Sequence, residues 1–415
     1  ELYSKICVAQ SIKPVASEAR NEVVDKNATY KFSCNLATIL AQDIEVVAVR
    51  LEISDCCKVY ISKNGPWLDK DVVYINKIEG YLRNISKDSP KESKANSDAL
   101  ASEIRTYCSN KLESRFKKLK KDLTRNPDEE YIESFTEYAS ADYKEFDPKK
   151  LNDVSRPKMS AICYYYYKKL DQSDKSAIPE EFLGHLRKVG SYVASAVNIV
   201  ECASKVKYKN LFSNIELRIM KPIIITDQPI YSWEYVIKSF VRNHVDYERF
   251  KEECLNDDHI VNRLNKMYSN KETGQLQLDD SNIKTHVYLH AEMNILANMI
   301  DQEDKSTTFI GVSKRCCYLC ELYIDFAREQ GYNIIISGKH GKIYSGWKLP
   351  QVANINFRIS SLKYILANLD RVIESKVKHY TRSLDADSDS YASSEKNSNN
   401  VVREREVANA FAGNF

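Results

Sequence analysis

The sequence predicts a layered α/β protein that carries a large, mainly helical block. Two observations predict this class: short apolar strands alternate with helices after Thr285, and apolar residues recur every three or four positions through most of residues 67–280. The 415 residues exceed one average domain, so we expect two or three structural units.

Composition excludes several classes of protein. Lys and Arg number 61 against 58 Asp and Glu, so the net charge of +3 selects neither nucleic acid nor membrane as a partner. No apolar run approaches the roughly 18 residues of a membrane span, and we expect no membrane association. The 11 cysteines are mostly scattered singly, which favours a reducing compartment, the cytoplasm or the nucleus.

The first predicted unit covers residues 20–66. A helix is expected over Tyr30–Ala41, because Phe32 and Leu36 begin an apolar face at helical spacing. An alternating apolar pattern over Val46–Asn64, with a turn in the middle, then predicts a β-hairpin. The unit is therefore a helix followed by a hairpin.

Residues 67–280 form the predicted helical block. Its basic stretch at 115–121 could contact phosphates, but lysines around a Phe/Leu stripe are more typical of a solvated helix face. The aromatic run Tyr164–Tyr167 could stack on bases, but packing within the block is the simpler explanation. A block of this size could also bind a protein partner.

Residues 281–360 predict a compact α/β region. We expect strands at Thr285–Leu289, Thr308–Val312 and Asn333–Ser337, with helices at His290–Ile300 and Cys316–Gln330. A C-terminal helix follows at 361–380, and residues 381–415 have the polar composition of a disordered tail.

Three metal-binding side chains mark the starts of those two helices. His290-Ala291-Glu292 opens the first helix, and Cys317 and Cys320 open the second with C-x2-C spacing. Two thiolates and one imidazole suit zinc and leave a fourth position for water. The sequence therefore predicts a zinc site formed by His290, Cys317 and Cys320.

These motifs resemble the zinc-dependent cytidine deaminase-like superfamily, whose signature is H-x-E followed by P-C-x-x-C. The amino-acid sequence around His290 and over residues 313–320 most resembles that of a poorly characterised branch found in fungi and among bacterial toxin-like deaminases. One departure is Cys316, which occupies the proline position and could itself be a ligand, although we favour Cys317.

The resemblance implies a three-layer mixed sheet with helices on both faces. In that superfamily a helix and a hairpin precede the H-x-E helix directly, so we expect the deaminase domain to be split, with residues 67–280 as an insertion.

The resemblance also implies the reaction. Zinc would lower the pKa of a water molecule to about 7 for attack on the amine-bearing carbon of cytosine or adenine, and Glu292 would carry the proton. The substrate would be a nucleoside, a nucleotide or a single-stranded nucleic acid.

Four further residues are candidates for substrate binding. Asn64 matches an asparagine that commonly contacts substrate in the superfamily, although turn chemistry alone could explain it. A glycine-containing loop after the last strand holds His340, Tyr344 and Trp347 beside three lysines, and we expect it to wall the base pocket. Packing within a tight surface loop is the alternative for these three side chains.

The sequence also allows a non-catalytic function, in which the zinc site is structural. His286 and His290 with Cys317 and Cys320 would complete a closed Cys2His2 site and make the protein a zinc-stabilised interaction scaffold with a deaminase-like fold. However, His286 and His290 fall in one expected strand, where residues four apart are about 13 Å apart and cannot share one ion.

Overall fold

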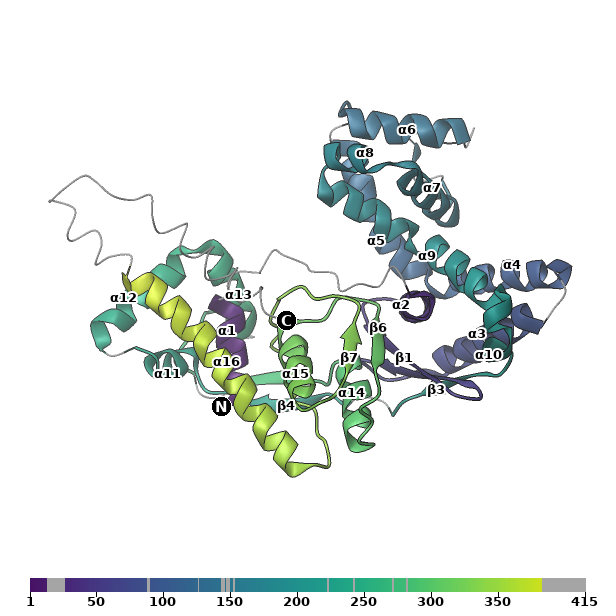
Figure 1. The fold of residues 1–415 in the computed structure, drawn as a ribbon. Helices are drawn as coiled ribbons and strands as arrows, with labels where there is room; N and C mark the ends of the chain where they lie inside the picture. The colour runs from purple at the N-terminus through teal and green to yellow at the C-terminus, as the bar shows by residue number, and fades with distance from the viewer. Residues whose placement is uncertain are drawn as a thin grey trace.

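The computed structural model describes residues 1–12, 27–87, 90–125, 127–142, 146, 150–151, 154–221, 224–241, 243–270, 272–280 and 283–382. The fold is mixed α/β, as the sequence predicts, with a five-stranded sheet between helices and a large helical region (Figure 1). Residues 20–26 of the first predicted unit and 383–415 of the predicted tail lie outside the described residues. The proposed unit boundaries stay a prediction.

The main sheet has the strand order β3-β2-β1-β6-β7. Its strands are β1 (Val47–Ile53), β2 (Cys57–Lys63), β3 (Ile215–Ile219), β6 (Thr308–Val312) and β7 (Ile334–Ile336). The hairpin strands β1 and β2 are antiparallel, β1 pairs antiparallel with β6, and β6 runs parallel to β7. Sequence-distant segments therefore form one sheet.

Helices cover both faces of this sheet. The helix α2 (Ala28–Leu40) packs against β1 and β6, whereas α14 (Ala291–Asp301) packs against β1 and β2. Successive β1 residues follow this division: Val47 and Val49 join the core around α2, and Ala48 joins the core around α14. Gly311 in β6 permits the close approach of α2, because a Cβ atom there would lie 2.6 Å from the carbonyl carbon of Ser33.

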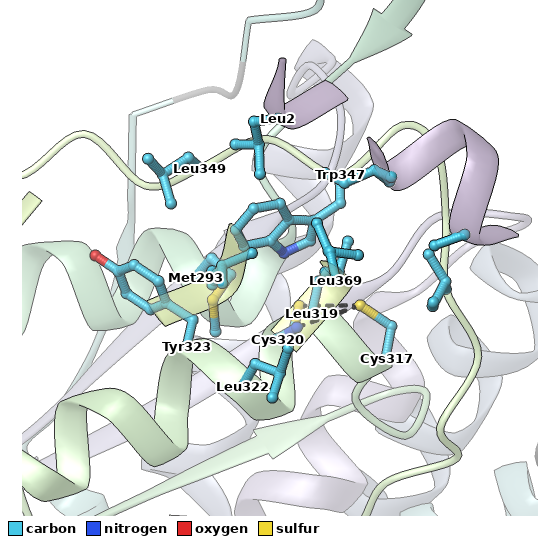
Figure 2. Packing of buried hydrophobic residues seen from close by; sticks show 14 of the residues in the cluster. Leu2, Met293, Cys317, Leu319, Cys320, Leu322, Tyr323, Trp347, Leu349 and Leu369 are labelled. Carbon is cyan, nitrogen blue, oxygen red and sulfur yellow. Dashed lines mark hydrogen bonds between the residues drawn. The ribbon is translucent and has the colours of Figure 1, made fainter. Parts of the chain in front are cut away.

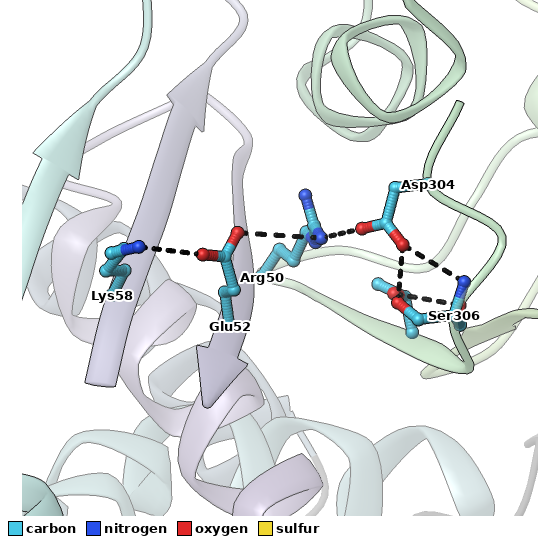
Figure 3. Close-up of polar contacts among 6 residues, drawn as sticks. Arg50, Glu52, Lys58, Asp304 and Ser306 are labelled. Carbon is cyan, nitrogen blue, oxygen red and sulfur yellow. Dashed lines mark hydrogen bonds and ion pairs between the residues drawn. The ribbon is translucent and has the colours of Figure 1, made fainter. Parts of the chain in front are cut away.

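An ion-pair network around the buried Arg50 links the hairpin to the loop between α14 and β6 (Figure 3). Arg50 is only 3% exposed and contacts Asp304, which also binds Ser306. On its other side, Glu52 lies 3.9 Å from Arg50 and 3.0 Å from Lys58. A buried guanidinium requires such partners, so these contacts fix β1 beside the start of β6.

Most of the remaining helices form two groups. The helical block consists of α3 (Asp69–Lys87), α4 (Pro90–Tyr107), α5 (Ser109–Arg125), α6 (Glu130–Asp142), α7 (Arg156–Lys169), α8 (Gln172–Ala177), α9 (Glu180–Ser204) and α10 (Lys209–Ser213). A second group lies on the other side of the sheet: α1 (Leu2–Ile12), α11 (Trp233–Lys238), α12 (His244–Asn256), α13 (Asp258–Tyr268) and α16 (Ile355–Arg382) (Figure 1). None of the helices in the described part of the chain combines the length and hydropathy that a membrane crossing requires.

The structure corrects two sequence predictions. The strand before α14, β5 (Lys284–Val287), does not join the main sheet but pairs with β4 (Thr226–Pro229) in a separate two-stranded sheet. The parallel β-α-β unit therefore consists of β6, the helix α15 (Tyr318–Glu329) and β7 alone. The block predicted as helical also contains β3, which pairs parallel with β2 and forms one edge of the sheet.

Candidate metal centre and active site

The starts of α14 and α15 converge at one end of the sheet. His290 is the N-cap of α14, and Cys317 is the N-cap of α15. Cys317 caps its helix by accepting a hydrogen bond from the amide of Cys320, one turn further on. The predicted trio is therefore assembled by two helix starts that follow different strands.

The three donor atoms form a compact triangle. The Sγ atoms of Cys317 and Cys320 are 3.4 Å apart, and Nδ1 of His290 lies 3.5 Å from the first and 3.3 Å from the second. Zinc bonds of about 2.3 Å to sulfur and 2.0 Å to nitrogen, at tetrahedral angles, would separate such donors by about 3.5–3.8 Å. The triangle therefore fits one zinc ion with little adjustment.

The electrostatics of the trio favour a bound cation. Burial alone would raise the pKa of the Cys317 thiol, but its hydrogen bond with Cys320 and the charge of His290 outweigh burial and hold that pKa well below its usual range. Burial and the neighbouring Cys317 sulfur raise the pKa of Cys320. One sulfur thus ionises readily and the second resists, because two adjacent buried thiolates need a positive charge between them.

Glu292 lies in the first turn of α14 and points into the protein. Its side chain is only 3% exposed, and its Oε2 atom has no hydrogen-bond partner among the described residues. Burial raises the pKa of this carboxyl. A buried carboxyl with one oxygen free of hydrogen bonds, beside a candidate metal site, is equipped to take up and release a proton.

Two tyrosines flank the ring of His290. The ring of Tyr288 lies 5.5 Å away and that of Tyr344 lies 6.2 Å away, measured between centroids. Tyr344 is 42% exposed and also contacts His340, at 5.8 Å. Two tyrosine rings therefore lie beside His290, and the role of the loop as a wall of the base pocket stays a prediction.

Asn64 lies near Tyr288, whose ring is beside His290. Its Oδ1 atom accepts a hydrogen bond of 2.7 Å from the amide of Val46, which closes the open end of the hairpin. The same side chain lies near the Tyr288 hydroxyl, where it partly offsets the rise that burial causes in the pKa of Tyr288. Sequence analysis missed Tyr288, although residues two apart in an extended segment point the same way, and Tyr288 lies two before His290.

Trp347 occupies a different environment from the other loop residues. Its side chain has 0% exposed surface and packs in the same buried cluster as Met293, Cys317 and Cys320 (Figure 2). In this conformation Trp347 belongs to the buried cluster that contains the two candidate cysteine donors, and its contact with a substrate stays a prediction.

Two other candidate ligands point elsewhere. Cys316 is fully buried, and its backbone pairs with the loop at Gly338 and His340, outside the donor triangle. His286 is on β5 and contacts Asp227 on β4. Within the described residues, only His290, Cys317 and Cys320 form a group of three or more side chains that could hold a metal ion.

The comparison with protein families agrees with this site. Residues 289–351 match a family model described as "OTT_1508_deam:-like deaminase". The matched stretch contains all three donors and Glu292. Comparisons with curated proteins and with solved structures gave no match. Residues 289–351 are thus similar to a deaminase domain.

Proposed function

We propose that this protein is a zinc-dependent hydrolytic deaminase that acts on the exocyclic amine of a cytosine or adenine base. The observation that carries the proposal is the triangle of His290, Cys317 and Cys320 together with the buried Glu292 carboxyl, two residues after His290 in the first turn of α14. The similarity of residues 289–351 to a deaminase family supports it. From the amino-acid sequence of its two motifs, we propose that the domain is related to the fungal and bacterial toxin-like branch of the deaminase superfamily.

Each residue has a defined task in this reaction. Zinc held by the three donors would supply a Lewis acid that makes a water molecule acidic at neutral pH. Glu292 takes the proton of that water and delivers it to the ring nitrogen beside the amine-bearing carbon. The oxygen of that water adds to the amine-bearing carbon. Glu292 then takes the second proton from the added hydroxyl and passes it to the amine, so that ammonia leaves as the carbonyl forms.

We favour a single-stranded nucleic acid as substrate because of a groove along α14. This groove, of 650 Å³, has Arg218, Lys221 and Lys348 in its lining, and Asp301 is the one acid among its lining residues in the described part of the chain. Arg218 is already paired with Glu216, at 2.6 Å, so Lys221 and Lys348 supply the positive charge that a ligand would meet. It also includes Leu289, next to the ligand His290. Phosphates of a bound strand would gain from this charge.

The lysines in the loop after β7 offer less positive charge to a nucleic acid than their number suggests. Lys339 forms an ion pair with Glu321, at 2.5 Å, so its charge is already neutralised. Lys348 lies within 3.2 Å of Thr226 and lines the groove. Changing Lys221 and Lys348 to Ala should therefore weaken strand binding and reduce its salt dependence, whereas Lys339→Ala should change neither.

The scaffold alternative loses its fourth ligand. A closed Cys2His2 site requires His286, and His286 contacts Asp227 instead. The cysteines support a reducing cellular compartment. All eleven lie in the described part of the chain and are free thiols. We therefore propose an enzyme of the cytoplasm or nucleus.

The direct test is a substrate panel. Purified, zinc-loaded protein is incubated with cytidine, adenosine, their nucleotides, and single-stranded DNA and RNA, and mass spectrometry detects exchange of an amine for a carbonyl. We expect the change in at least one cytosine or adenine compound. Failure across the panel by protein with one zinc per chain would favour the scaffold.

A further inference from the structure

A second cavity lies between α6, α7 and α8, at the end of the helical block that projects away from the sheet (Figure 1). Its volume is 790 Å³, and its walls combine aromatic rings with carboxylates. The proposed deaminase reaction does not use it, because the metal ligands lie at the starts of α14 and α15.

The pattern of α6 creates one wall of this cavity. Tyr131, Ser134 and Tyr138 follow one another at spacings of three and four and all line the cavity. Phe135, which directly follows Ser134, is fully buried in the core of the block. The hydroxyl of Tyr166 on α7 donates a hydrogen bond to Ser134, at 3.1 Å, which joins the two walls.

The cavity is strongly acidic. Glu129, Glu130, Glu137 and Asp174 line it, and Lys169 is the one cation among the described lining residues. Within the described part of the chain, Glu129, Glu130 and Glu137 have no ion-pair partner. These three side chains belong to exposed residues, so their charges face the solvent and attract a cationic ligand.

One internal contact shows that the cavity accepts a cation against an aromatic ring. The ammonium group of Lys169 lies 5.2 Å from the centroid of the Tyr138 ring. Such cation–π contacts add to the attraction of nearby carboxylates. Lys169 is itself exposed, so an incoming cation could displace it.

We propose that this cavity binds a basic peptide segment of a protein partner, with Lys or Arg side chains against Tyr131 and Tyr138. Glu130 and Glu137 are seven residues apart on α6, which corresponds to about 10 Å along the helix. A single small cation cannot contact both. An extended peptide can, because its alternate side chains are spaced by about 7 Å. The excess of carboxylates excludes a nucleic acid.

The test uses the full chain and a short fluorescent peptide in which Arg alternates with Ala. We expect saturable binding by fluorescence anisotropy, and no binding of the matched peptide with Glu in place of Arg. The double variant Glu130→Lys and Glu137→Lys should weaken the Kd about tenfold or more. Lys169→Met should tighten binding, because it removes the ammonium group that competes with the peptide for the Tyr138 ring.

Matched control variants distinguish peptide binding in the cavity from general electrostatic attraction of the peptide to the protein. Glu248→Lys with Glu252→Lys makes the same charge change on exposed positions of α12 and should alter the Kd less than about twofold. Lys168→Met, beside the cavity, should not reproduce the effect of Lys169→Met. Equal losses in both glutamate pairs, or tighter binding of spermine than of the peptide, would overturn the proposal.

Discussion

The Sγ atom of Cys320 lies 3.3 Å from Nδ1 of His290, although 30 residues separate them along the chain. This contact depends on both helix starts reaching the same end of one sheet. The hairpin near the N-terminus helps to fix that sheet, because β1 pairs with β6 immediately before the cysteines. The arrangement of the three candidate donors therefore depends on a hairpin near the N-terminus as well as on residues 290–320.

The first prediction concerns the metal ligands. Cys317→Ser, Cys320→Ser and His290→Ala should each reduce zinc to well below one ion per chain, because each removes one of three donors. Elemental analysis of purified protein measures this. Cys316→Ala and His286→Ala are the controls and should retain zinc. Loss of zinc from His286→Ala alone would refute the ligand assignment.

The second prediction concerns Tyr288 and Asn64. Tyr288→Phe removes the hydroxyl near the Asn64 side chain but keeps the ring beside His290. If this pair positions substrate, kcat/KM should fall about fivefold to tenfold, the equivalent of about 1 kcal/mol, while zinc content stays unchanged. Unaltered kinetics in both Tyr288→Phe and Asn64→Ala would remove them from the binding site.

The third prediction concerns pH and Lys111, whose side chain is 7% exposed. Burial, followed by the charge of Arg115, lowers the pKa of Lys111 from its ordinary 10.5 to about 8. Between these values the unfolded chain binds more protons, so this residue makes the free energy of unfolding rise with pH. Below pH 8 the full cost of burying the charge is present.

Lys111→Met removes that cost. The variant should be more stable than the wild type at pH 7, by up to roughly 3 kcal/mol, and the difference should shrink toward pH 10. Urea denaturation at both pH values measures it. The exposed Lys117→Met on the same helix should show no comparable change. A difference that grows with pH would contradict the buried-charge explanation.

The fourth prediction concerns the packing of α2 on the sheet. Gly311→Ala should destabilise the protein by about 1–3 kcal/mol, because its Cβ would collide with the backbone of Ser33 and Cys34. Gly80→Ala is the matched control in α3, where no atom lies within 4 Å of the added Cβ. That change should stabilise by about 0.5–1 kcal/mol. Thermal unfolding compares the two.

Local patterns predict the elements of this fold better than their pairing. The periodicity of residues 30–41 and the alternation in 46–64 predict α2 and the hairpin, and C-x2-C with H-x-E predicts the donor trio that the structure brings together. The alternation of Ile215, Leu217 and Ile219 signals β3, but a surrounding helical pattern obscures it.

The pairing of strands depends on contacts that sequence periodicity does not report. Nothing local in residues 284–287 distinguishes pairing with β4 from a place in the main sheet. Likewise, the alternation of the hairpin does not identify β6 as its neighbour. The burial of Trp347 is similar, because an aromatic in a glycine-containing loop could point either way.

The most direct test of the central proposal compares wild-type protein with Glu292→Gln, both carrying one zinc per chain. Ammonia release is measured with the best substrate from the panel. The amide keeps the shape of the side chain but cannot carry the proton, so release should fall by at least about a hundredfold while zinc content and folding stay unchanged. Equal ammonia release by the two proteins would contradict the proposed role of Glu292 and the deaminase mechanism built on it.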